Sequence, residues 1–133
     1  MKSDFFTYQA QTSPHPLAIE VSHAKGSYIY DTSGKEYLDF VAGVSANSLG
    51  HNHPKVTKAI KNQLDNYAHV MVYGEFIQKP QVDLCKILVE NSPANLNAVY
   101  LTNSGTEATE GALKLAKRVT ERSEIIAAKD SYH

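Results

Sequence analysis

Hydrophobic positions recur at helical spacing in the middle of this chain. Between residues 54 and 67 they define one face of a helix, formed by Val56, Ala59, Ile60, Leu64 and Tyr67. Pro54 suits the first turn of this helix, because proline has no N–H to lose there. A second amphipathic helix is expected from about residue 79 to residue 90, before Ser92 and Pro93 stop it.

The pattern changes to strand-like runs nearer the N-terminus. Residues 27–31 and 36–40 are rich in Tyr, Ile, Leu and Phe, and the segment between them contains Gly34. A tight reversal often needs a residue with positive φ, which glycine supplies at no steric cost. These features predict a β-hairpin. Residues 1–23 lack periodicity and are expected to form an extended arm, and residues 41–53 a glycine-punctuated loop.

The C-terminal part has the order strand, helix, strand. Strands are expected at residues 98–102 and 124–128, with an amphipathic helix at residues 105–121 between them. A connection of this length favours parallel pairing with a right-handed crossover. The predicted fold class is therefore α/β.

The start of this last helix is a candidate anion site. Ser104 and Glu107 have capping-box spacing, which places the N–H groups of Gly105 and Thr106 at the positive end of the helix dipole. Gly105 has no side chain to block a ligand, and the Thr106 hydroxyl can donate, so a phosphate could bind here without a basic residue. Ser-x-x-Glu also caps helices that bind nothing. Ser104 is treated as a cap first and a phosphate ligand second.

Four other residues are of types that can carry chemistry. His51 and His53 could point two imidazoles the same way, but no further ligand is near in the sequence, so a loop-structuring or entrance role is favoured and no metal is expected. Cys85 falls in the apolar pattern of a helix and is expected to be a packed thiol. Tyr132 follows the second predicted strand, at the sheet edge where α/β proteins bind ligands, or is a plain strand-end tyrosine.

Composition narrows the classes of partner. Hydrophobic residues make up 42% of the 133 residues, charged residues 20%, and the formal net charge is −1. With this net charge, no strong electrostatic field is expected that would attract nucleic acid or an anionic membrane surface. No segment approaches the ~20 apolar residues of a membrane span, and a single cysteine excludes a disulfide framework within one chain. A cytoplasmic location is expected.

Several segments resemble one family in sequence order. NSGTEA followed by ALKLAKR is similar to the cofactor-phosphate segment of the class III, ornithine-type pyridoxal-phosphate aminotransferases. YIYDTSGKEYLDF resembles that family's early hairpin, AGVSANSLGHNHPKV its Gly-His-x-His-Pro loop and PQVDLCKIL its next helix. SEIIAAKDSYH is similar to the strand that delivers an aromatic-His pair over the cofactor ring. The resemblance runs from about Ala24 onward.

The resemblance implies the N-terminal portion of a fold type I transferase that depends on pyridoxal 5'-phosphate. It assigns cofactor binding to Ser104, Gly105, Thr106, Tyr132 and His133. It also implies a division into an N-terminal arm (1–23), a small-domain hairpin and loop (24–53) and the start of the cofactor-binding large domain (54–133). Such arms cross the partner in a homodimer.

The implied reaction moves an amino group from an amino acid or ω-amine to a 2-oxo acid. None of the lysines lies in the context of the family's Schiff-base lysine, which belongs beyond His133, so no catalytic residue is assigned and this chain alone is expected to be an inactive fragment. Alternatives are an aminomutase, decarboxylase or racemase on the same cofactor, or a non-catalytic polypeptide. Thr109 and Gly111 depart from the Asn and Ala common in the family.

Overall fold

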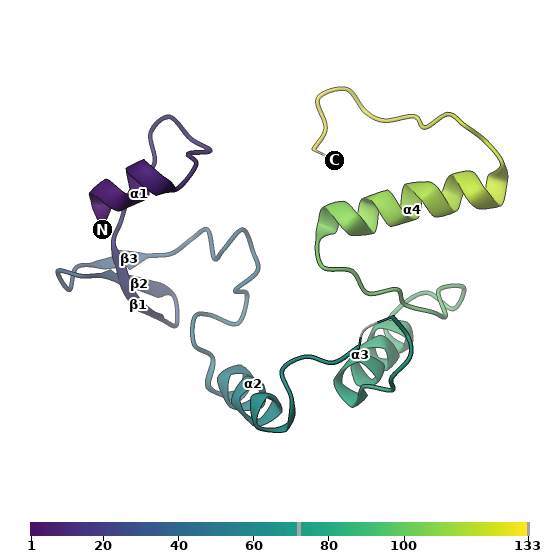
Figure 1. Ribbon diagram of the computed structural model, residues 1–133, viewed down its shortest axis with the longest axis horizontal. Coiled ribbons are helices and arrows are strands. Elements are labelled where there is room, and N and C mark those ends of the chain that lie inside the picture. Colours follow the sequence, from purple (N-terminus) through teal and green to yellow (C-terminus); the bar gives the residue numbers. More distant parts are fainter. Residues whose placement is uncertain (72, 133) are drawn as a thin grey trace. The chain divides into compact units, whose positions relative to one another are not determined.

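The computed structural model describes residues 1–71 and 73–132 (Figure 1). The chain divides into two compact units, Met1–Val70 and Met71–His133. None of the described residues is buried, and large apolar side chains of the helices are exposed to solvent. Within the described residues, no helix has the length and apolar character that crossing a membrane would need.

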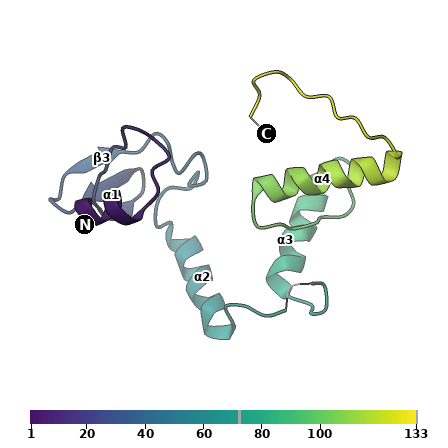
Figure 2. The ribbon, with the colours of Figure 1, turned by 45° about the horizontal axis from the view of Figure 1, so that its top comes forward.

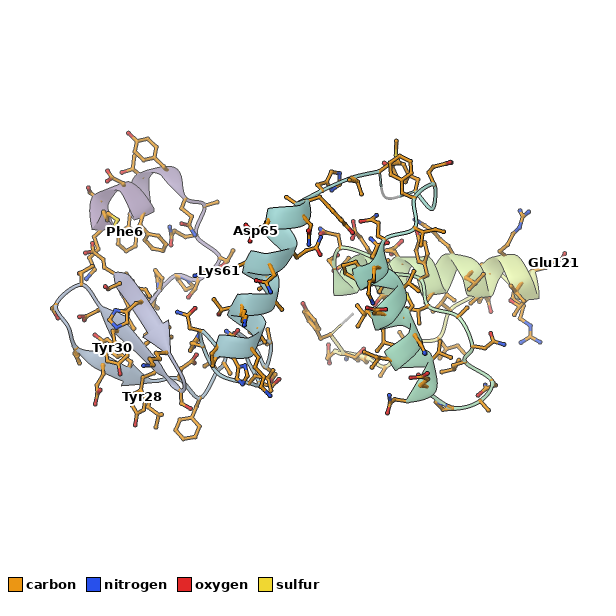
Figure 3. The ribbon with its side chains drawn as sticks, turned by 90° about the horizontal axis from the view of Figure 1, so that it is seen from below. Phe6, Tyr28, Tyr30, Lys61, Asp65 and Glu121 are labelled. Carbon is orange, nitrogen blue, oxygen red and sulfur yellow. The ribbon has the colours of Figure 1, made fainter. Side chains whose placement is uncertain are left out.

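The first unit contains a three-stranded antiparallel sheet in the order β1-β2-β3, formed by β1 (Val21–Lys25), β2 (Tyr28–Asp31) and β3 (Glu36–Leu38). The predicted hairpin is confirmed, because β2 and β3 pair with Ile29 opposite Tyr37. The ring of Tyr30, labelled in Figure 3, stacks on that of His23 across β1 and β2 at 4.5 Å. The sequence did not predict β1.

A carboxylate closes the turn between β2 and β3. Asp31 accepts hydrogen bonds from the backbone N–H groups of Ser33 and Lys35 at 2.8 and 3.0 Å, and from the Tyr37 hydroxyl at 2.9 Å. Gly34 has φ +85°, as the sequence predicted for this reversal. All of these contacts span six residues or fewer, so the turn is built by its own sequence.

The prediction of an extended arm over residues 1–23 is wrong at both ends. Residues 2–8 form a short helix, α1 (Lys2–Tyr8), and the first strand begins at Val21. Met1 and Asp4 form an ion pair at 3.7 Å within the first turn. The N–H of Thr32 donates to the carbonyl of Glu20 at 3.0 Å, which extends the sheet contacts towards the N-terminus.

The loop after β3 has an unusual backbone. Ala42, Gly43, Val44 and Ser45 are consecutive and all have positive φ, between 49° and 66°. The N–H of Ser45 donates to the Val41 carbonyl at 3.0 Å, which closes a left-handed turn. Left-handed helical backbone costs roughly 1–2 kcal/mol for each residue that is not glycine. The turn is therefore strained and needs support from contacts around it.

Helices predicted from the hydrophobic pattern are confirmed. α2 (Pro54–Asn66) begins at proline as expected, and α3 (Lys79–Glu90) and α4 (Gly105–Thr120) follow in the second unit (Figure 2). The C-cap residue that follows α4 is Glu121, labelled in Figure 3, which has left-handed backbone with φ +58°. Residues 98–102 and 124–128 are not strands in the structure, so the two predicted strands flanking α4 are absent from it.

Candidate functional site

Residue Ser104 is the N-cap of α4. Its backbone is extended, with φ −149° and ψ 162°, and its hydroxyl oxygen accepts the N–H of Glu107 at 3.2 Å. The capping role predicted from the Ser-x-x-Glu spacing is therefore confirmed. The Ser104 carbonyl accepts the N–H of Ala108 at 3.0 Å and starts the helical hydrogen bonds.

The turn before α4 is held from its other side as well. The Glu107 carboxylate accepts the N–H of Asn103 at 2.8 Å, one residue earlier than in the usual capping box. The hydroxyl of Thr102 donates to the Ser104 carbonyl at 3.0 Å. These short-range bonds fix residues 102–107 in one conformation, although neither residues 98–102 nor residues 124–128 form a strand.

Gly105 and Thr106 occupy the first two positions of α4 and are exposed. The first N–H groups of a helix point out of its N-terminal end, where the helix dipole is positive. A Cβ built on Gly105 would meet nothing within 4 Å, so the space beside this residue is open to a ligand. Lys117 and Arg118 in the last turn complement the opposite end of the dipole. The residues present therefore fit a phosphate group.

The segment after α4 turns back along the helix. Figures 1 and 2 both show it returning towards the end of α4 at which Gly105 lies. The segment turns at Asp130, with φ +58°, and the Ser131 hydroxyl donates to the Ala128 carbonyl at 2.8 Å. Tyr132 is 93% exposed. His133, the other residue assigned to the cofactor ring, lies outside the described residues.

His51 has a structural partner that the sequence analysis missed. Its Nε2 lies 2.7 Å from a carboxylate oxygen of Asp39, and the two side chains are only 18% and 8% exposed. This contact agrees with the loop-structuring role expected for His51. The partner was missed because Asp39 lies twelve residues earlier, a separation at which no helical or strand periodicity links two positions.

The second histidine has a different environment. His53 is the N-cap residue of α2 and borders a cavity of about 350 Å³ between the preceding loop and the helix. Its Nδ1 is buried and has no hydrogen-bond partner among the described residues. Within residues 1–71 and 73–132 no group of three His, Cys, Asp or Glu side chains is arranged to hold a metal. Cys85 on α3 is partly exposed.

Two carboxyl groups of the first unit have lowered pKa values. The hydrogen bond from His51 is the largest cause of the lowered pKa of Asp39, followed by the N–H of Ala42. The pKa of Asp31 falls to about 2, mainly because the Ser33 hydroxyl donates to it at 2.6 Å. The Asp31 carboxylate stabilises the hairpin turn, and the Asp39 carboxylate stabilises the loop that follows the hairpin.

The family model for class III aminotransferases matches residues 8–133. The chain belongs to this family. It is 45% identical to the acetylornithine aminotransferase of Methanothermobacter thermautotrophicus over 115 residues, which are 86% of this chain and 28% of that protein. It is 42% identical to the acetylornithine aminotransferase of Bacillus amyloliquefaciens, again over 86% of this chain, and spans 48% of that protein.

Solved structures agree with this membership of class III. The taurine:2-oxoglutarate aminotransferase of Bifidobacterium kashiwanohense, solved with PLP and glutamate, superposes with a TM-score of 0.83 and 30% identity. The match covers 91% of this chain and 27% of that one. The fold is therefore that of the N-terminal part of a fold type I transaminase, as the sequence predicted, and the chain spans about a quarter to a half of the length of the relatives named here.

Proposed function

We propose that the protein carrying this chain is an aminotransferase dependent on pyridoxal 5'-phosphate. In this proposal the turn Ser104, Gly105 and Thr106 holds the cofactor phosphate. The observation that carries it is the capped start of α4, where an added Cβ on Gly105 meets open space. A phosphate dianion placed there gains backbone N–H donors and the positive end of the helix dipole.

The roles of the chain in this reaction are binding and orientation. The chemistry that bound pyridoxal phosphate would supply here is that of an electron sink. Gly105 and Thr106 would anchor its phosphate, while Ser104 keeps the helix start in shape through its bond to Glu107. The family resemblance assigns Tyr132 and His133 to the cofactor ring, and the return of the described segment after α4 towards the phosphate turn supports this role for Tyr132.

Substrates and assembly follow from the relatives. Their names make N-acetylornithine the first amino donor to test, with 2-oxoglutarate as the acceptor. An amino acid or ω-amine donor and a 2-oxo acid acceptor remain the proposed classes. A homodimer, a cytoplasmic location and a start of the large domain at residue 54 belong to the same proposal, supported by the family resemblance and the near-neutral composition.

The test compares two glycines of the same helix. Gly105→Val should weaken retention of pyridoxal phosphate by ~2 kcal/mol or more, because the side chain would block charge-assisted hydrogen bonds to the phosphate. Gly111→Val is the matched control, since neither glycine has an atom within 4 Å of an added Cβ. Cofactor absorbance and amino transfer from N-acetylornithine are measured. Equal cofactor affinity in both variants would overturn the assignment.

A second pair of variants tests the ring contact. Tyr132→Ala should lose about 0.5–1.5 kcal/mol of stacking and shift the cofactor absorption band, whereas Tyr132→Phe keeps the ring and should be mild. Cofactor titrations of both variants provide the measurement. If the two changes have equal effects, the hydroxyl rather than the ring makes the contact.

A further inference from the structure

The side chain of Asp39 anchors the start of the left-handed turn at residues 42–45. One carboxylate oxygen accepts the N–H groups of Val41 and Ala42 at 3.0 and 2.9 Å. The other oxygen accepts Nε2 of His51 at 2.7 Å. The Asp39 side chain is 8% exposed, so these three donors take the place of water around the carboxylate.

His51 is itself fixed to the sheet. Its N–H and carbonyl exchange hydrogen bonds with Gly26, at 2.7 and 3.0 Å, in the turn between β1 and β2. The backbones approach closely here, because a Cβ built on Gly50 would lie 3.0 Å from the Gly26 carbonyl oxygen. The imidazole therefore has a defined position, from which it orients the Asp39 carboxylate.

Two apolar side chains in and before the turn are largely exposed in the described part of the chain. Val44 is a β-branched residue at φ +57°, a conformation that such residues rarely adopt, and its side chain is 87% exposed. Phe40, which precedes the turn, is 90% exposed. Strained backbone persists only where surrounding contacts determine it, and among the described residues these contacts include the hydrogen bonds that Asp39 accepts.

We propose that Asp39 and His51 form a latch that holds residues 42–45 in their left-handed conformation, and that the loop is a two-state element. With the latch closed, the apolar side chains of the loop have one defined placement. When the latch opens, the backbone relaxes and the strain at Val44 is relieved. Strained segments of this kind are used as clamps and switches in proteins.

Amide hydrogen exchange in the full chain tests the latch. Asp39→Ala should speed exchange at Val41, Ala42, Ser45 and Asn47 by about tenfold to a hundredfold, the effect of losing charge-assisted hydrogen bonds. Asp31→Ala is the matched control, because the bonds that the Asp31 carboxylate accepts within the described residues come from Ser33, Lys35 and Tyr37, in the other turn of the same sheet. Unchanged exchange at Ser45 and Asn47 in Asp39→Ala would overturn the proposal.

Three further variants separate a latch from general loss of structure. His51→Gln retains an N–H donor near the position of Nε2 and should preserve slow exchange, whereas His51→Ala should not. Val44→Gly removes the strain, so Asp39→Ala should accelerate exchange at Ser45 less in the Val44→Gly background than in the natural chain. Equal acceleration in the two backgrounds would contradict a strained, latched turn even if Asp39→Ala also loosens the hairpin.

Discussion

The hairpin of the first unit is stabilised by groups that lie close together in the sequence. The strands expected on either side of α4 in the second unit would instead need partners far away in the sequence. β2 and β3 pair across a four-residue turn closed by Asp31. In the α4 region, residues 102–107 are also closed locally, but the segments 98–102 and 124–128 form no strands. Parallel strands pair across long connections and are covered on both faces, so local contacts cannot build them. The capped helix start forms without them.

A substitution in the hairpin turn should change stability more than the other changes described below. Gly34→Val places a β-branched residue at φ +85°, which should destabilise the hairpin by about 1–3 kcal/mol. The measurement is exchange of the Asp31 N–H, which donates to the Lys35 carbonyl at 3.0 Å. Gly34→Asn is the control, because asparagine tolerates positive φ better. No difference between the two variants would show that the turn does not depend on this glycine.

The cap of α4 gives a smaller effect confined to the second unit. Ser104→Ala should cost ~1 kcal/mol of helix stability, since it removes the acceptor for the Glu107 N–H. Ser104→Asp should restore most of it, because aspartate also caps helices. Exchange at the Glu107 amide reports the change. Similar protection in all three proteins would mean that the Glu107 bond to Asn103 alone fixes the helix start.

The smallest effect is the response of the hairpin to acid. The pKa of Asp31 is lowered to about 2 from its usual 3.8, so its contribution to stability is complete above pH 3.8 and is lost as the pH falls towards 2. Opening of the hairpin, followed by exchange at Asp31, should increase over this range. In Asp31→Asn this acid dependence should be reduced, and an unchanged dependence would assign it to other groups.

The same contrast explains what the sequence could predict. Helix bounds were predictable because Pro54, the Ser104 cap and the apolar spacing act within a few residues. β1 was missed because Ser22, His23 and Lys25 lack a strand-like apolar pattern, and pairing with β2 defines this strand. The short helix α1 was not predicted, because no side-chain cap marks its start.

The contacts of the functional residues were likewise predictable only where both partners lie close together in the sequence. The phosphate turn was predicted from Ser104 and Glu107, and the structure confirms the cap. The contact between Asp39 and His51 was not predicted, because it joins positions twelve residues apart through the folded sheet. The Tyr132 assignment came from the family resemblance and remains a prediction.

The start of α4, which is held by short-range hydrogen bonds, is proposed to bind the phosphate of the cofactor. The most direct measurement follows the amide resonances of Gly105 and Thr106 in the protein carrying this chain during titration with pyridoxal phosphate, and with pyridoxal, which lacks the phosphate. Both amides should shift strongly with pyridoxal phosphate and weakly with pyridoxal, since in this proposal backbone N–H groups at the helix start contact the phosphate. Equal shifts with the two compounds, or none at Gly105 and Thr106, would contradict it.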